Sequence, residues 1–139
     1  MEVLKPATIE GCPVVQDGEE IYARLMNGET VYHWEEGDSM TPILRDREYC
    51  RIIPLDDQKV RIGDAVFCDF DGNCNFMVHM VTMISDNRYD GKRYYQIGST
   101  NGMIFGWTST IYGIAYGTNI FEKKTIGEEF SDFIKRPFK

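Results

Sequence analysis

Six short runs rich in β-branched and aromatic residues constrain the fold of this chain more than any other feature. Residues of these types favour the pleated, half-buried surface of a sheet, and turn-forming residues separate each run from the next. A β domain with at least six strands is therefore predicted. The runs cover residues 29–36, 48–54, 64–70, 75–84, 92–98 and 111–118.

Two Asp-Gly pairs indicate how neighbouring strands connect. Asp71 and Gly72 separate the third run from the fourth, and Asp90 and Gly91 separate the fourth from the fifth. An Asp-Gly pair between two strand patterns is a strong signal for a tight hairpin turn, because glycine readily adopts the positive φ that such a turn needs. Consecutive strands should therefore pair in antiparallel fashion.

A short amphipathic helix is predicted over residues 17–27, before the first run. Asp17 provides an N-cap, with Glu20 three residues later. Ile21 and Leu25 are four residues apart and therefore lie on one face of the helix. This face should pack against the sheet.

A second helix is predicted in the C-terminal extension, residues 119–139. Thr125 and Glu128 have capping-box spacing, apolar residues follow at helical intervals, and Pro137 stops the pattern. The 139 residues fit a single domain, with a β core at about residues 31–118.

Composition excludes several classes of function. Fifteen basic and 22 acidic residues give a net charge of −7, which disfavours nucleic acids and anionic lipids as partners. The four cysteines form no C-x-x-C pair and only two histidines are present, so no metal or other cofactor is expected. No apolar run approaches the ~20 residues that span a bilayer. We therefore expect a cytoplasmic protein with reduced thiols, no nucleic-acid partner and no stable membrane insertion.

Ser39 is the first candidate for chemistry. It stands in the segment GDSMTP, residues 37–42, directly after a predicted strand. Gly37 lets the backbone bend and Pro42 stiffens the turn, so Ser39 should lie at a strand end, in a cleft. A serine hydroxyl is a weak nucleophile unless a base accepts its proton, so the site requires a titratable partner.

His79 is the main candidate for that base. It lies inside the run FMVHMVTM, where the strand pattern would accept an aliphatic residue. His33 is an alternative, but its alternating surroundings favour a structural cross-strand pair near a sheet edge. A lone strand histidine commonly bonds to backbone groups in the core, and this alternative stays open for His79.

Four segments of the chain occur in an order found in a known family. They are GDSMTPIL at residues 37–44, VRIGDAVF at 60–67, MVH ending at His79, and IGSTNG at 97–102. In this order they resemble the serine peptidase superfamily of signal peptidases and SOS-repressor (LexA-like) autoproteases. The chain looks closest to soluble bacterial members that have a serine and histidine site, and the resemblance covers about residues 31–118.

This resemblance implies both a fold and catalytic roles. The fold would be mostly β, built from coiled antiparallel sheets of the LexA and signal peptidase type, with a short N-terminal helix and a C-terminal helix. Ser39 would be the nucleophile and His79 the base. In the histidine branch of the family a later aspartate orients the histidine, but Ser99 stands in that segment here. By this resemblance, a residue that carries no charge replaces the third catalytic member.

Other residues near the predicted site have secondary roles in this interpretation. Asp38 or Asp86 could replace the absent aspartate, although a side chain next to Ser39 normally points away from it. The backbone N–H groups around Ser39, in the region of Asp38 and Met40, would hold an oxyanion. Asp64, in a Gly-Asp turn, is expected to cap backbone groups.

Several aromatic residues could be taken for a platform that stacks single-stranded nucleic acid or sugars. Basic residues do not accompany most of them, and the net charge is unfavourable. Sheet core and strand pairing explain them more simply. They are Trp34, Tyr94, Tyr95, Phe105 and Trp107.

Three functions fit these residues. The leading prediction is a serine endopeptidase that cleaves an extended polypeptide, in cis or in trans, with the small residues near the scissile bond that the resemblance implies. The first alternative is a catalytically impaired module that binds an extended peptide on the same fold, since Ser99 cannot supply a charge. The second is a phage-repressor-type dimerisation and autocleavage domain, which would form a homodimer but lacks a DNA-binding helix pair in this chain.

Overall fold

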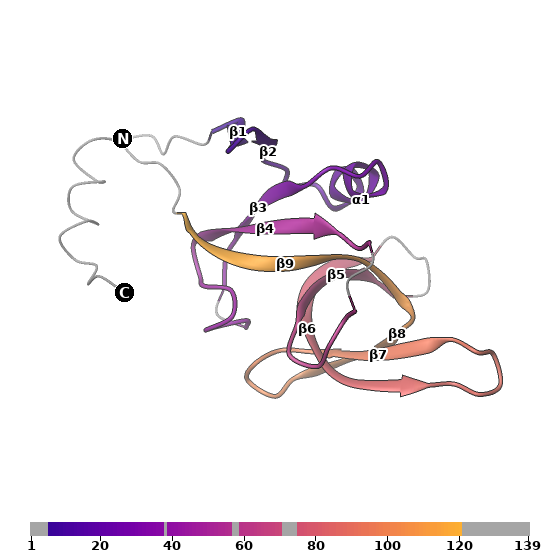
Figure 1. Cartoon of the computed structure of the whole chain (residues 1–139). Coiled ribbons are helices and arrows are strands. Elements are labelled where there is room, and N and C mark those ends of the chain that lie inside the picture. Colours follow the sequence, from indigo (N-terminus) through magenta and orange to yellow (C-terminus); the bar gives the residue numbers. More distant parts are fainter. Residues whose placement is uncertain (1–5, 38, 57–58, 71–74, 121–139) are drawn as a thin grey trace.

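The computed structural model describes residues 6–37, 39–56, 59–70 and 75–120, and they form a mostly β domain (Figure 1). The main sheet has seven antiparallel strands in the order β3-β4-β9-β5-β6-β7-β8, and a small second sheet pairs β1 with β2. The elements are β1 (Thr8–Ile9), β2 (Cys12–Pro13), α1 (Gly18–Met26), β3 (Val31–Glu35), β4 (Glu48–Pro54), β5 (Ala65–Asp69), β6 (Phe76–Asp86), β7 (Arg93–Gly98), β8 (Ile104–Thr108) and β9 (Thr110–Ile120).

The six predicted runs all form strands, and the runs joined by the two Asp-Gly pairs lie next to each other in the sheet. The second and third runs, β4 and β5, do not pair as predicted, because β9 lies between them. β5 pairs antiparallel with β6, and β6 pairs antiparallel with β7. Gly91 adopts a φ of +73° in the turn between β6 and β7. The Asp71-Gly72 pair and the predicted C-terminal helix lie outside the described residues. The sequence patterns missed β8 and the two short strands β1 and β2.

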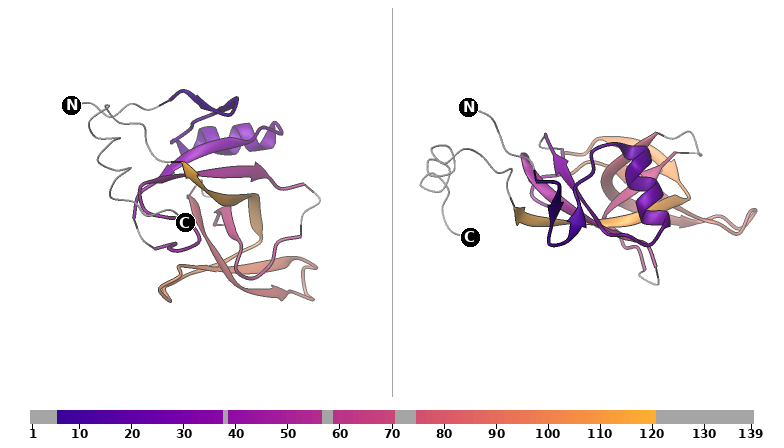
Figure 2. Two further views of the ribbon diagram at one scale, coloured as in Figure 1. Left: turned by 60° about the vertical axis from the view of Figure 1, so that its left-hand side comes forward. Right: turned by 90° about the horizontal axis from the view of Figure 1, so that it is seen from above.

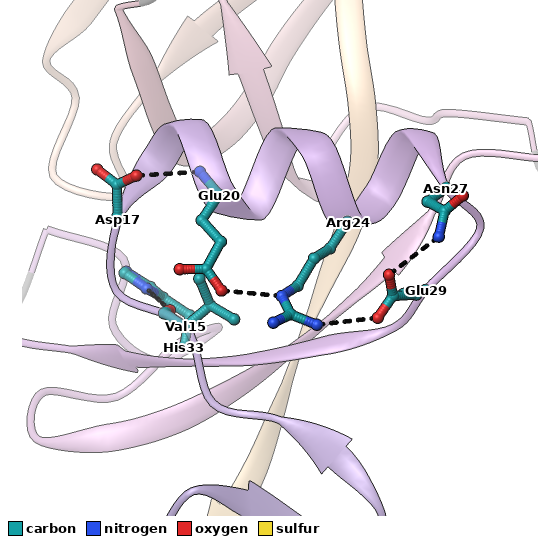
Figure 3. A network of polar contacts seen from close by, with 7 residues as sticks. All are labelled: Val15, Asp17, Glu20, Arg24, Asn27, Glu29 and His33. Atoms are coloured by element: carbon teal, nitrogen blue, oxygen red, sulfur yellow. Dashed lines mark hydrogen bonds and ion pairs between the residues drawn. The ribbon is translucent and has the colours of Figure 1, made fainter.

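Helix α1 begins and ends as its sequence predicts (Figure 3). The Asp17 carboxylate accepts a hydrogen bond from the Glu20 amide at 3.1 Å, which satisfies one of the free N–H groups of the first turn. Arg24 forms ion pairs with Glu20 at 2.9 Å and Glu29 at 3.0 Å. Ile21 and Leu25 are buried, so the predicted apolar face packs against the sheet.

Strand β5 lies at the centre of the packing, because all five of its residues are buried. Successive side chains of a strand point to opposite faces. Phe67 packs in the cluster beneath α1, which also contains Leu25 and Ile52, whereas Val66 belongs to a second cluster with Val81. Both faces of β5 are therefore covered. Figure 2 shows how the main sheet curls.

Strand β9 joins the two halves of the main sheet. Its later part pairs with β4 and its earlier part pairs with β5, with an overlap at residues 113–115. A Cβ atom added to Gly113 would lie 2.7 Å from the Ile53 carbonyl oxygen, so only glycine allows this close approach. The Ser39 segment follows β3, which belongs to the β4 half, and His79 lies in β6, which belongs to the β5 half.

A half-buried polar cluster lies between β3 and β4. His33 pairs with Cys50 across the strands, and its Nδ1 lies 3.0 Å from the Val15 carbonyl oxygen. A carbonyl only accepts, so Nδ1 carries the proton and Nε2, 3.4 Å from a Glu35 carboxyl oxygen, is free to accept. Burial raises the pKa of Glu35 to about 7 and lowers the pKa of His33, which favours a neutral pair.

The raised pKa of Glu35 predicts a pH-dependent contribution to stability. Because the folded pKa lies above that of the unfolded chain, this contribution is complete below about pH 4 and is lost as the pH rises through about 7. The loss should amount to roughly 2–3 kcal/mol of unfolding free energy between about pH 4.5 and 8. Urea denaturation of wild type and Glu35→Gln should show this difference only in the wild type. Parallel pH curves for the two proteins would contradict it.

Candidate functional site

Ser39 is held at the surface by the turn that follows β3. Gly37 adopts a φ of +109°, and its amide donates to the Asp46 carboxylate at 2.7 Å. The Met40 side chain is buried in the cluster beneath α1, and its carbonyl accepts from the Leu44 amide at 2.9 Å. Because Met40 anchors the turn in the core, the adjacent Ser39 side chain remains half-buried at the surface.

The predicted pair is brought together across 40 residues of sequence. The Ser39 Oγ lies 3.4 Å from the His79 Nε2. A nucleophile and its base are usually 2.6–3.2 Å apart and are often slightly further apart without substrate, roughly the separation seen here. His79 is set on β6 opposite Val66 of β5, so the central strand of the core fixes its backbone.

His79 has no partner for its second ring nitrogen within the described ranges. Nδ1 is buried and makes no hydrogen bond. Ser99, the residue expected in the orienting segment, donates instead to the Asn101 side chain and accepts from the Met103 amide at 3.2 Å. Ser99 therefore makes no orienting contact with His79 in the described structure, because local turn hydrogen bonds use its hydroxyl.

Of the two aspartates proposed as replacements, Asp86 does not supply that contact in the described structure. Asp86 pairs with Arg93 at 2.7 Å in the β6–β7 hairpin, and its side chain is 69% exposed. Asp38 lies outside the described residues. The Ser39 and His79 pair therefore forms a dyad in the part of the chain that the structure describes.

Burial lowers the pKa of His79, and no charged group of the described residues contributes to the shift. The imidazole is consequently neutral at neutral pH and is able to accept a proton from Ser39. Its ring packs against Phe105, with ring centroids 4.5 Å apart and planes inclined by 63°. Sequence reasoning missed this contact, because it treated Phe105 as a residue of the sheet core.

Thr100 is a second residue that the sequence did not single out. Its amide donates to the Ser39 carbonyl at 2.8 Å. Its hydroxyl lies within hydrogen-bond distance of two carbonyl oxygens, those of Ser39 at 3.0 Å and Thr41 at 2.7 Å. The segment after β7 therefore fastens the backbone on both sides of Met40. These contacts join the turn that carries Ser39 to the hairpin that follows His79.

The region around Ser39 also offers donors for a developing negative charge. Among the described residues, the amide groups of Ser39 and Met40 donate no hydrogen bond. Free amides beside a nucleophile are the usual components of an oxyanion hole. The Met40 side chain anchors this segment in the core, and an oxyanion role for its amide stays a prediction.

The residues expected to be structural have structural contacts. His33 forms the cross-strand pair described above, on the edge strand β3. The Asp64 carboxylate accepts from the Arg61 amide at 2.9 Å, as a capping residue does. Trp34 is buried against Tyr49, but Phe105 and Trp107 are 41% and 39% exposed, so the core does not explain these two.

A pocket of about 380 Å³ lies apart from the dyad, at the β6–β7 hairpin. Neither Ser39 nor His79 lines it. It is lined by Ser85, Asp86, Asn87, Arg88, Tyr89, Tyr94 and Trp107. The described residues contain no group of three or more His, Cys, Asp or Glu side chains that could hold a metal ion. They also contain no helix of the length and hydropathy needed to cross a bilayer.

Comparison with known proteins finds no matching family model, no matching curated protein and no matching solved structure.

Proposed function

We propose that this chain is a serine endopeptidase-like protein that cleaves an extended polypeptide with Ser39 as nucleophile and His79 as base. The observation that carries the proposal is the 3.4 Å separation between Ser39 Oγ and His79 Nε2. These residues are 40 positions apart in the sequence, and the elements that carry them belong to different halves of the sheet. Their contact brings together the hydroxyl oxygen and the imidazole nitrogen that such a reaction requires.

The chemistry would proceed by acyl transfer. His79 Nε2 accepts the Ser39 hydroxyl proton as Oγ attacks the scissile carbonyl, and the free amides of Ser39 and Met40 hold the oxyanion. The imidazolium then gives its proton to the leaving amine, so the peptide bond breaks and an acyl-enzyme remains. His79 next takes a proton from water as the water oxygen attacks the acyl carbon. The imidazolium then returns this proton to Ser39 Oγ as the ester bond breaks, which releases the acyl group as a carboxylic acid and regenerates both residues.

No carboxylate of the described residues bonds to His79 Nδ1, and this sets an expectation for the rate. In a triad the carboxylate fixes the tautomer and stabilises the imidazolium, and its loss lowers the rate by about 10⁴-fold. Burial without a countercharge disfavours the imidazolium of His79 further. We therefore expect slow turnover, suited to a protein that cleaves itself or a tethered partner.

A stretch of β6 that does not pair with β7 supports the proposal that the substrate is extended. β7 pairs with β6 only from Met80 onward, so among the described strands residues 76–79 of β6 have no neighbour on that side. A polypeptide added there as a strand would bring its carbonyl groups to His79 and Ser39.

Covalent labelling tests this proposal. A fluorophosphonate, which reacts with activated serines, should modify the wild type at a single site, and Ser39→Ala should abolish the modification, as measured by intact-protein mass spectrometry. Ser85→Ala, which changes a serine near the hairpin pocket, serves as the matched control and should label normally. Labelling that survives in Ser39→Ala, or is absent from the wild type at every pH, would contradict the proposal.

The Thr100 contacts give a further prediction. Thr100→Val keeps the shape of the side chain but removes the hydroxyl that contacts the Ser39 and Thr41 carbonyl groups. It should cost about 1–2 kcal/mol of unfolding free energy and slow labelling of Ser39 several-fold, because the turn loses its fastening. Thr118→Val removes a comparable bond to the Tyr49 carbonyl and should lower stability alone. Equal labelling rates in the two variants would show that Thr100 does not position Ser39.

A second candidate function is a binding module that retains the β6 edge but does not cleave. The buried, unpartnered Nδ1 of His79 favours it, because an unused catalytic group needs no orienting partner. The two functions separate in one comparison. A non-cleaving module would bind peptide equally well in wild type and Ser39→Ala and would show no fluorophosphonate labelling in either.

A further inference from the structure

Strand β8 contains a β-bulge at the level of the dyad. Ile97 of β7 pairs with Gly106, but the next residue, Gly98, pairs with Ile104. Phe105 is therefore the additional residue that has no partner on β7. A bulge redirects the side chain that it carries, and bulges are enriched beside active sites for this reason.

The bulged residue is the one whose ring meets His79. The two ring centroids are 4.5 Å apart with planes inclined by 63°, which is a favourable edge-to-face arrangement. Phe105 is also 41% exposed and belongs to none of the buried apolar clusters. A phenylalanine that served only the core would be buried, so its position needs another explanation.

His79 lacks the contacts that normally fix an imidazole. Nε2 faces Ser39, Nδ1 is buried without an acceptor, and Ser99 bonds elsewhere. Because Nδ1 makes no hydrogen bond, only the 3.4 Å contact with Ser39 and side-chain packing are left to fix the rotation of the ring about its Cβ–Cγ bond. Among the described side chains, the aromatic ring that packs against the His79 ring is that of Phe105.

We propose that Phe105 is a positioning residue for His79, which it orients by ring packing in place of a carboxylate. The proposal rests on the dyad function given above and identifies what holds the base. Phe105 keeps Nε2 directed at Ser39 and keeps water from the imidazole. Water excluded in this way accounts for the direction of the His79 pKa, since desolvation is its cause.

Histidine NMR tests the contact without any need for catalysis. The chain has two histidines, His33 and His79, so a His33→Asn sample assigns the ring protons. In Phe105→Ala the His79 ring protons should lose the ring-current shift, and the pKa of His79 should rise toward its ordinary value. Phe105→Tyr keeps the ring and should restore both. Ile104→Ala removes an exposed neighbour and should leave the His79 signals unchanged.

Labelling of Ser39 tests the consequence. Phe105→Ala should slow fluorophosphonate labelling by roughly 3- to 10-fold, the size expected of one aromatic pair, and Phe105→Tyr should recover the wild-type rate. The proposal is overturned if Phe105→Ala matches Ile104→Ala in both the NMR titration and the labelling rate. It is also overturned if tyrosine fails to rescue. If the wild type does not label at all, the dyad function fails, while the NMR titration still decides whether Phe105 orients His79.

Discussion

His79→Ala is expected to slow fluorophosphonate labelling of Ser39 by about two to four orders of magnitude near pH 8, the usual contribution of a general base. The variant keeps Ser39 and its amide donors but removes the group that accepts the hydroxyl proton. His33→Ala is the matched control, because it removes the other histidine of the chain. The His33 ring contacts the Val15 carbonyl oxygen and not Ser39. Labelling rates are read by mass spectrometry.

The pH profile of the same experiment has a defined direction. Burial places the pKa of His79 below its ordinary value, so neutral imidazole is present at lower pH than for an exposed histidine. The wild-type rate should rise with pH through this lowered pKa and then reach a plateau. His79→Ala should lack that rise. A wild-type rate that does not respond to pH below about 7, or an alanine variant as fast as the wild type, is incompatible with His79 as the base.

Phe67→Ala is expected to lower the free energy of unfolding by about 3–5 kcal/mol, the largest loss of stability that we predict for a single substitution. Phe67 lies on the central strand β5, is buried, and stacks on Phe76 with centroids 5.3 Å apart. It also contacts the Tyr112 ring at 6.3 Å, so truncation leaves a cavity between β5, β6 and β9. The total free energy of unfolding of a typical domain is about 5–15 kcal/mol, so this variant should be close to unfolding.

Urea denaturation measures this loss directly. Phe67→Leu should lose less, because it fills most of the cavity, and Tyr89→Ala should be nearly neutral, since Tyr89 is 89% exposed. A Phe67→Ala loss below about 1 kcal/mol would mean that β5 is not the centre of the core.

The sequence predicted the strands well because each buried run has a short-range signature. Residues 48–54 form β4 over the same bounds that their β-branched and aromatic content suggested. The sequence patterns did not predict β8, because it contains Gly106 and exposes three of its five residues. No alternation of apolar and polar residues therefore marks it. β1 and β2, of two residues each, are too short to have a pattern.

The candidate site was predictable only in part, for a related reason. Ser39 and His79 stand out locally, Ser39 two residues after a glycine in a turn and His79 as a titratable residue in an apolar strand. The roles of Thr100 and Phe105 depend on tertiary geometry instead. Thr100 reaches a carbonyl 61 residues away, and Phe105 is aimed by a bulge that exists only in the pairing of β7 with β8. No periodicity in the sequence encodes either contact.

The position of β9 bears on when the dyad comes into existence during synthesis. β9 is the last described strand in the sequence, yet it lies between β4 and β5 in the sheet. A ribosome therefore releases the half that leads to Ser39 and the half that contains His79 before the strand that joins them. Until residues 110–120 have emerged, no pairing among the described strands holds the two halves together. A nascent chain should consequently carry an unreactive Ser39, and reactivity should begin only once translation has passed β9.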